Sequence, residues 1–508
     1  MKKAYLAFDL GAESGRAMLG VLDGGKLEFH ELHRFANIPR RLPSGLHWNL
    51  LDLWGNLLEG LRKAASHCRD NGLELASLGV DTWGVDYGLL GKSGELLALP
   101  HAYRDERNIA ASEKAIAKLG RERIYRETGI QFMAFNTLFQ LAAANEAEPG
   151  LLERAKRLAM VPDLLHYFLS GEAICEATDA STTQMIDPRG GPTGAWARGL
   201  LADLGLPDGM LGEITPAGTC IGRLREAVAQ ETGAGGVKVI APASHDTASA
   251  IAAVPADDRT SWCYLSSGTW SLMGVELPGP LINDAAMAAN FTNERGLAGT
   301  VRFLRNIPGL WMVQQVRQDL SQRAGGGTNL DYASLAAAAA KAAPFRTLVD
   351  PNHAPFGQPG GMIGKIAAFA AATGQVRPGD VGALVRCCLE SLALEYRRTL
   401  DALEAVVGRR IDVIHIVGGG GRNELLNQMT ADATGRTVIA GPHEATAAGN
   451  ALVQAMGDGL VASPVEIRRV VRQSFSPRTF QPSDTAAWDK AWDRYAGLIL
   501  TPPRRGLD

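Results

Sequence analysis

Two segments far apart in the chain share one pattern, and this repetition constrains the fold more than any other feature. Residues 5–9 form an apolar strand, residues 11–15 a glycine-containing turn, and residues 16–21 a returning strand with a Leu-Gly-Val ending. Residues 262–266, 267–269 and 270–275 repeat this order and end in Met-Gly-Val. Chance similarity between two short hairpins is the alternative. Helical and strand patterns alternate after both segments, so we predict a duplicated α/β unit.

The length of the chain agrees with two domains. With 508 residues, of which 46% are hydrophobic and 21% charged, the chain exceeds the roughly 250 to 300 residues at which single cores stop growing. We place an N-terminal domain at residues 1–250 and a C-terminal domain at residues 251–508. A cleft is expected between them.

Charge and cysteine content exclude several classes of protein. The 51 basic and 54 acidic residues give a net charge of -3, so no broad positive field attracts nucleic acid or an anionic membrane. Six scattered cysteines form neither a disulfide framework nor a CxxC pattern. No apolar run approaches the roughly 20 residues that span a bilayer, and we expect a cytoplasmic protein. Monomer and homodimer both stay open.

Periodicity places the main elements. Strands are predicted at residues 4–10, 16–22, 26–35, 78–80, 237–240, 413–417 and 437–440. Helices are predicted from Asp52 onward and at residues 335–343, 381–407, 423–434 and 445–456, with a flexible loop at 325–327. Residues 306–315 are typical of a loop that leads into an amphipathic helix.

Both glycine turns suit a phosphate. Asp9 closes the first strand, and the turn that follows can direct backbone N–H groups at a phosphate while Asp9 orients a hydrated Mg²⁺. Thr269 adds a hydroxyl in the second turn. Each turn alone is equally well explained as an ordinary β-hairpin. Two such turns at equivalent places in two halves are what clamping a triphosphate requires.

A third glycine-rich stretch, residues 418–421, lies between a predicted strand and a helix. The dinucleotide fingerprint requires a further glycine where this chain has Asn423. A loop on which an adenosine lies flat fits better. Residues 91–93 imitate the end of a P-loop, but Asp86 occupies the upstream glycine position, so a Walker site is excluded.

The best candidate for the chemistry is Asp246, which follows a strand and stands between His245 and Thr247. A carboxylate there can accept the proton of a substrate hydroxyl during phosphoryl transfer, while its neighbours hold adjacent hydroxyls. From the residues alone, a helix N-cap is the somewhat better explanation of Asp246. The polar segments 81–86 and 103–105 offer groups for binding a polyol. For any one of these side chains, however, a structural role is the default explanation.

Taken together, these segments resemble the FGGY family of carbohydrate kinases from Asp9 to about Gly457. The most specific stretches are residues 79–90, 103–107, 136–141, 244–250, 264–274, 305–315 and 417–428. The resemblance implies two ribonuclease H-like, actin-like ATPase domains. It also implies an ATP-dependent kinase that acts on the 1-hydroxyl of L-rhamnulose with Mg²⁺. Another ketose such as L-fuculose, or a non-catalytic ATP-binding switch protein, is the alternative.

The resemblance also implies roles for particular residues. Asp246 would be the general base, and Asp9 would face the metal. The sugar would contact Gly84, His245, Thr247 and Asn306. ATP would contact Ala12, Glu13, Ser14, Gly15, Arg16, Thr269, Gln314, Gly419 and Gly420. Glu13 departs from the small or hydroxylated residue more usual in this turn, and we expect it to face solvent or Mg²⁺.

Overall fold

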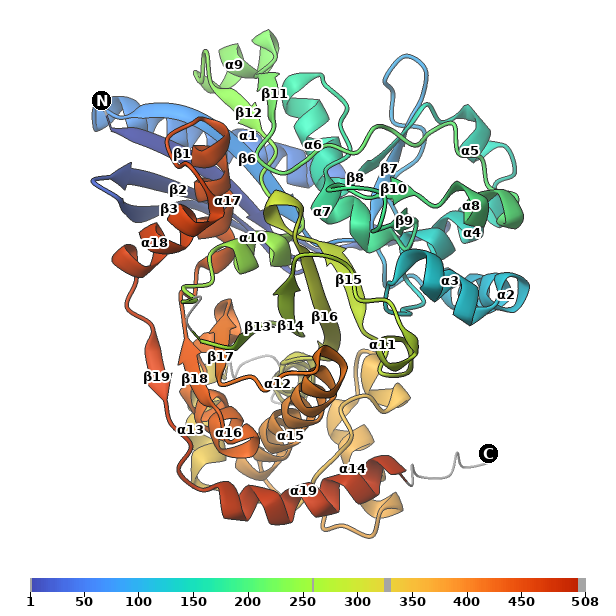
Figure 1. Ribbon diagram of the computed structural model, residues 1–508, viewed down its shortest axis with the longest axis vertical. Coiled ribbons are helices and arrows are strands. Elements are labelled where there is room, and N and C mark those ends of the chain that lie inside the picture. The colour runs from blue at the N-terminus through green and yellow to red at the C-terminus, as the bar shows by residue number, and fades with distance from the viewer. Residues whose placement is uncertain (1, 258–259, 324–329, 501–508) are drawn as a thin grey trace. The chain divides into compact units, whose positions relative to one another are not determined.

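The computed structural model describes residues 2–257, 260–323 and 330–500, and its chain is divided into two compact units (Figure 1). Unit 1 comprises residues 1–255, 276–304 and 444–476, and unit 2 comprises residues 256–275, 305–443 and 477–508. Each unit is therefore built from three separate segments of the chain. The predicted loop at 325–327 lies outside the described residues, and the domain boundary at residue 250 stays a prediction.

Unit 1 contains most of the strands and short helices. Its strands are β1 (Lys3–Leu10), β2 (Ser14–Asp23), β3 (Lys26–Ala36), β4 (Arg40–Leu42), β5 (Gly45–His47), β6 (Glu74–Thr82), β7 (Tyr87–Leu90), β8 (Arg157–Met160), β9 (Ile186–Asp187), β10 (Ala195–Trp196), β11 (Cys220–Arg223), β12 (Lys238–Ile240), β15 (Thr292–Arg295) and the beginning of β16 (Val301–Pro308). Its helices are α1 (Leu50–Asp70), α2 (Arg107–Leu119), α3 (Arg121–Thr128), α4 (Thr137–Ala147), α5 (Leu151–Arg154), α6 (Val161–Ser170), α7 (Ala177–Ala180), α8 (Arg198–Leu204), α9 (Glu226–Thr232), α10 (Asp246–Ala252), α11 (Asp284–Ala288), α17 (Ala445–Gly457) and α18 (Pro464–Ser474).

Unit 2 has fewer and longer elements. Its strands are the end of β16, β13 (Trp262–Ser267), β14 (Trp270–Leu277, whose last residues belong to unit 1), β17 (Val413–Val417), β18 (Thr437–Ala440) and β19 (Arg478–Phe480). Its helices are α12 (Trp311–Arg323), α13 (Tyr332–Lys341), α14 (Met362–Ala372), α15 (Val381–Val407), α16 (Glu424–Thr434) and α19 (Thr485–Leu500).

The two units use one strand topology. In unit 1 the sheet order is β3-β2-β1-β6-β12-β11, where β1 is antiparallel to β2 but parallel to β6, and β6 is parallel to β12. In unit 2 the order β14-β13-β17-β18-β19 repeats this arrangement, with β13 antiparallel to β14 and parallel to β17. The duplication predicted from the two hairpins is confirmed.

Successive side chains of β1 pack on opposite faces of the unit 1 sheet. Leu6 and Phe8 are buried in a core cluster with residues of α1, whereas Ala7 packs with Ala447 of α17. Side chains of a strand alternate between faces, so one strand serves two layers. Figure 1 shows α17, from the end of the chain, beside strands from its beginning. The first strands are therefore held by residues more than four hundred positions away.

The long helix α15 spans the predicted residues, and its caps explain why. The Asp380 carboxylate accepts a hydrogen bond from the N–H of Ala383 at 2.8 Å, and Gly408 adopts a left-handed φ of 69° at the other end.

The prediction for residues 306–315 is wrong at its start. Asn306 lies within strand β16 and not in a loop, whereas the predicted helix after it is present as α12.

Candidate active site

The β1–β2 turn is closed by its own backbone and by Asn37. The N–H of Gly11 donates to the carbonyl of Ser14 at 2.9 Å, and the N–H of Asn37 donates to the carbonyl of Glu13 at 2.9 Å. Glu13 and Ser14 are exposed, and Ala12 is half-buried. A Cβ on Gly15 would lie 2.3 Å from the Phe35 ring, so a larger residue there would have to displace that ring. Residue 13 is exposed, and the orientation of the Glu13 carboxylate toward solvent or Mg²⁺ stays a prediction.

Arg16 lies between two carboxylates at the base of this turn. Its Nη2 donates to Asp9 Oδ2 at 2.5 Å, and its Nη1 donates to Glu444, the N-cap residue of α17. Burial raises the pKa of Asp9 despite the opposing effect of Arg16, and the nearby charges of Asp246 and Glu444 add to the rise. Arg16, which the resemblance places against ATP, is thus paired with Asp9 and Glu444 in this structure.

A second carboxylate lies directly beside Asp9. Asp81 is its partner in the parallel register of β1 and β6 and is fully buried. Its Oδ2 accepts a hydrogen bond from Asn450 at 2.6 Å, while Oδ1 has no partner among the described residues. Burial, together with the charge of Asp9, raises its pKa well above the usual range. The pair forms a site in which negative charge is poorly compensated and a cation is favoured.

Asp246 is the first residue of α10, directly after a rigid loop. The N–H of Ser244 donates to Glu176 and the N–H of His245 donates to Thr178 Oγ1, both at 3.1 Å. The Asp246 Oδ1 accepts from the N–H of Thr247 and, at 3.0 Å, from its hydroxyl. The N-cap position belongs to His245, whose side chain makes no capping hydrogen bond, so the explanation of Asp246 as a helix N-cap is wrong. Oδ2 has no hydrogen-bond partner among the described residues, and the side chain is 31% exposed.

Gly84 lies where no other residue fits. A Cβ there would come within 2.8 Å of the Thr182 side chain, whose Oγ1 accepts a hydrogen bond from the N–H of Val85 at 2.9 Å. Val85 has a φ of 69°, a rare conformation for a β-branched residue. Strained backbone of this kind is concentrated at functional sites, where surrounding contacts maintain it. Residues 83–86, between β6 and β7, therefore form a rigid turn.

The acid at the end of that segment is structural. Asp86 Oδ2 accepts hydrogen bonds from the indole of Trp48 at 2.6 Å, the indole of Trp83 at 3.0 Å and the N–H of Tyr103 at 3.0 Å. Burial raises the pKa of Asp86 to about 6. Asp105 is used similarly, because its two oxygens accept the backbone N–H groups of Leu46 and Arg107. A structural role therefore explains Asp86 and Asp105 better than binding of a polyol.

Replacing Asp86 by alanine is expected to destabilise unit 1 by about 2 kcal/mol, because four buried donors, including the Gln140 amide at Oδ1, lose this acceptor and water compensates only in part. Urea unfolding followed by the fluorescence of Trp48 and Trp83 measures this. Asp23→Ala removes an exposed acid whose side chain is 60% accessible and paired with Lys2, and should change stability by less than about 0.5 kcal/mol. Equal effects for the two variants would contradict the assignment.

In unit 2 the residues proposed for ATP gather at one end of the sheet. Gln314 Nε2 of α12 donates to Thr269 Oγ1 at 3.0 Å, and Gln314 Oε1 is buried without a partner among the described residues. A Cβ on Gly420 would lie 2.2 Å from Ser267 Oγ, whereas Gly419 has no neighbour within 4 Å of its Cβ position. Gly420 thus permits contact with the β13–β14 turn, and Gly419 presents open backbone. Asn306 is half-buried on β16.

A pocket of about 250 Å³ opens beside the glycine loop, at the carboxyl ends of β17 and β18. Its lining comprises Gly421, Arg422, Glu424, Ala440, His443, Arg478 and Phe480. Asn423, which breaks the dinucleotide fingerprint, is the N-cap of α16 and accepts the N–H of Leu426 at 3.0 Å. The loop therefore ends in an ordinary capped helix.

Comparison with known proteins identifies the family. The N-terminal domain model of the FGGY family of carbohydrate kinases matches residues 4–252, and the C-terminal domain model matches residues 263–457. The chain belongs to the FGGY family of carbohydrate kinases. Membership of this family implies that the chain uses ATP.

Two curated FGGY relatives align along almost the whole chain. A protein named rhamnulokinase from Bacteroides thetaiotaomicron is 42% identical over 499 residues, which cover 98% of this chain and 100% of the relative. One from Bacillus subtilis is 39% identical over 480 residues, covering 94% of this chain and 96% of the relative.

Solved FGGY-type structures share the fold at low identity. A gluconate kinase from Lactobacillus acidophilus has a TM-score of 0.81 at 15% identity, covering 99% of both chains. Plasmodium falciparum glycerol kinase with ADP has a TM-score of 0.77 at 15% identity, covering 100% of this chain and 99% of the other. These likenesses confirm the predicted actin-like ATPase fold and carry no further conclusion.

The acids of unit 1 suit a metal that arrives with the nucleotide. Within the described ranges, no group of three or more His, Cys, Asp or Glu side chains is placed to hold a metal ion by itself. Mg²⁺ commonly binds through one or two carboxylates together with substrate phosphates and water. Asp9 and Asp81, the latter with its unpartnered Oδ1, match that requirement.

The described helices include none long and apolar enough to cross a bilayer.

Sequence reasoning did not single out Glu444, Glu294 or Arg302. A signal for Glu444 was present, because His443-Glu444 follows β18 and precedes α17 as His245-Asp246 follows β12 and precedes α10. In a duplicated fold these positions correspond. Glu294 and Arg302 carry no comparable signal, since their role depends on the pairing of β15 with β16.

Proposed function

We propose that this FGGY kinase transfers the γ-phosphoryl group of ATP to the 1-hydroxyl of L-rhamnulose, giving L-rhamnulose 1-phosphate and ADP. The proposal is supported by the full-length similarity to curated rhamnulokinases. The structural observation that carries the mechanism is Asp246, whose Oδ1 is held by its own helix while Oδ2 is unpartnered among the described residues.

In the proposed mechanism, Asp246 accepts the proton of the sugar 1-hydroxyl. A bond forms between that oxygen and the γ-phosphorus, the bond to the β–γ bridging oxygen breaks, and ADP leaves. His245, Thr247, Gly84 and Asn306 are proposed to hold the sugar. Positioning and charge stabilisation supply most of the catalysis in such transfers.

The remaining residues are proposed to bind Mg²⁺–ATP. Asp9 would hold the ion, with Asp81 beside it, and bound Mg²⁺ supplies neutralisation of phosphate charge. Unit 1 would contribute Ala12, Glu13, Ser14, Gly15 and Arg16, and unit 2 would contribute Thr269, Gln314, Gly419 and Gly420. Arg16 can release one of its two acids when phosphate arrives.

A ketose panel tests the proposed substrate. With L-rhamnulose, L-fuculose and L-ribulose, we expect the highest kcat/KM for L-rhamnulose, and ³¹P–¹H NMR of the product should place the phosphate on C1. A higher value for L-fuculose would support the alternative ketose. ADP release that no sugar stimulates would support a switch protein instead and contradict the kinase.

We also propose a cytoplasmic location. All six cysteines are free, and five of them are buried. Free buried thiols are typical of reducing compartments.

A further inference from the structure

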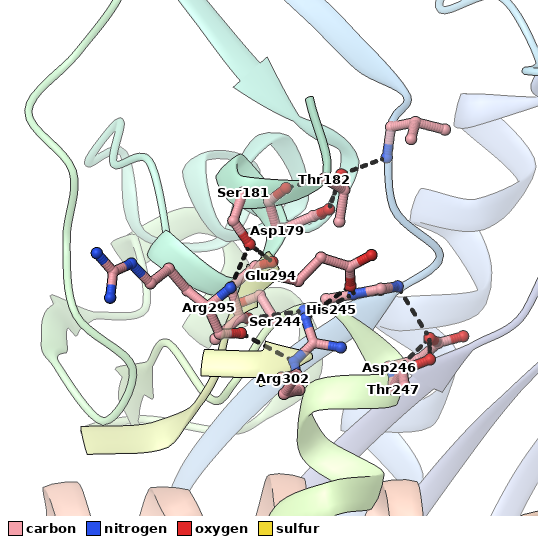
Figure 2. A network of polar contacts seen from close by, with 12 residues as sticks. Asp179, Ser181, Thr182, Ser244, His245, Asp246, Thr247, Glu294, Arg295 and Arg302 are labelled. Carbon is pink, nitrogen blue, oxygen red and sulfur yellow. Dashed lines mark hydrogen bonds and ion pairs between the residues drawn. The ribbon is translucent and has the colours of Figure 1, made fainter. Parts of the chain in front are cut away.

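A buried ion pair lies behind His245. Glu294 and Arg302 are directly opposite one another in the antiparallel register of β15 and β16. Arg302 is 0% and Glu294 5% exposed. The Arg302 Nη2 lies 3.1 Å from Glu294 Oε2 and 3.0 Å from His245 Nδ1. Figure 2 shows the imidazole of His245 between this hairpin and Asp246.

The contacts of His245 Nδ1 are mutually exclusive. This nitrogen lies 3.0 Å from the Arg302 guanidinium and 3.3 Å from Glu294 Oε2. It can accept from Arg302 only without a proton, and it can donate to Glu294 only with one. A guanidinium has five donors, no acceptor and a permanent charge. A protonated Nδ1 would therefore face another donor at 3.0 Å.

Arg302 supplies Glu294 with a positive counter-charge even when the imidazole of His245 is neutral. Although burial alone would raise it, the guanidinium of Arg302 and, after it, the contact with His245 hold the pKa of Glu294 below its usual range. The two charges cancel, and a neutral imidazole adds none, whereas an imidazolium would place a second cation against Arg302. Asp246, Asp179 and Glu176 are further acids near this region, and burial raises the pKa of Asp179 well above its usual range and also raises that of Glu176.

We infer that Arg302 is a positioning residue that fixes His245 as a neutral imidazole protonated on Nε2, and thereby directs an N–H donor to the sugar side of Asp246. His245 Nε2 lies 3.5 Å from Asp246 Oδ1, too far for a hydrogen bond but adjacent to it. The donor is thus available to a hydroxyl oxygen of the sugar while Asp246 accepts a proton. This inference deepens the proposed function and rests on it.

The hairpin that carries Arg302 is itself anchored. Arg302 Nε donates to the carbonyl of Arg295 at 2.9 Å, and the N–H of Arg295 donates to Ser181 Oγ at 2.8 Å. Ser181 lies just after α7, whose N-cap, Glu176, also holds the backbone of Ser244. The loop before His245 and the hairpin that carries Arg302 are therefore both hydrogen-bonded to α7 or to the residue that follows it. Figure 2 shows the labelled residues of this network.

The tautomer can be measured on the intact wild-type chain. Of the ten histidines, His245 is assigned in ¹⁵N-histidine-labelled protein by the signal lost in His245→Gln. At pH 8 we expect a neutral ring with the proton on Nε2. A proton on Nδ1, or a doubly protonated ring, would overturn the inference. The spectrum does not depend on turnover, so the inference can fail while the kinase proposal survives. Equally, the kinase proposal can fail while the Nε2 tautomer is observed.

Two variants test whether Arg302 is the cause. In Arg302→Met the proton should move to Nδ1, where Glu294 accepts it, and kcat should fall about 10- to 100-fold, as when a partner that fixes a histidine tautomer is lost at metal sites. Arg302→Lys should restore the Nε2 proton and part of kcat. Glu294→Gln is the matched control, because Arg302 still donates to Nδ1. Retention of the Nε2 proton in a folded Arg302→Met variant would remove Arg302 from this role.

Discussion

Asp246→Asn is expected to reduce kcat by about 10² to 10⁴-fold, the contribution typical of a positioned general base. Asparagine has the same shape, and its Oδ1 can still accept from the N–H and hydroxyl of Thr247, as the carboxylate does. Its amide nitrogen cannot accept the proton of a sugar hydroxyl. The start of α10 should therefore stay intact while proton transfer is lost, and ATP binding should be preserved.

Asp284→Asn is the matched control for this change. Asp284 is also the first residue of a short helix in unit 1, and its side chain is 79% exposed. This variant should keep wild-type kcat. Steady-state kinetics with L-rhamnulose, and calorimetric binding of a non-hydrolysable ATP analogue, measure the two properties separately. Near-normal turnover by Asp246→Asn would remove Asp246 from the role of base.

The parts of the fold that were predicted correctly are those encoded locally. Helix α15 was predicted at residues 381–407, and the structure shows that an aspartate cap and a terminal glycine set these same ends locally. The two hairpins were found because strand, turn and strand adjoin in sequence. Their shared topology then followed from the repeat. None of these features requires knowledge of distant contacts.

What the sequence did not predict depends on distant pairing. Asn306 is followed by Pro308 and Gly309, which are typical of a loop, and its place on β16 depends on the pairing of β16 with β15 and β14. The segment 81–86 offered groups for a polyol, with a structural role as the default for each side chain, and Asp86 takes that structural role because its Oδ2 accepts from two indoles. Unit 1 also recruits residues 444–476. The roles proposed for Asp246 and its neighbours came from local sequence and stay predictions.

Gly449→Ala is expected to destabilise unit 1 by about 3 kcal/mol or more, at or above the upper end of the usual cost of overpacking a core. A Cβ at this position would lie 1.8 Å from the carbonyl oxygen of Ser249 and 2.5 Å from its carbonyl carbon. Both are backbone atoms of α10, which cannot rotate away as a side chain does. Because α10 begins at Asp246, its displacement should also lower kcat.

The same substitution at Gly55 should have the opposite effect on stability. Gly55 lies within α1, is exposed, and has no atom within 4 Å of its Cβ position. Alanine is favoured over glycine there by roughly 0.5 to 1 kcal/mol, because it restricts the unfolded chain and meets no obstacle. Urea unfolding of both variants, with kcat measured in parallel, compares them. If Gly449→Ala were as stable as Gly55→Ala, the close approach of α10 and α17 would be contradicted, and with it the rigid placement of Asp246.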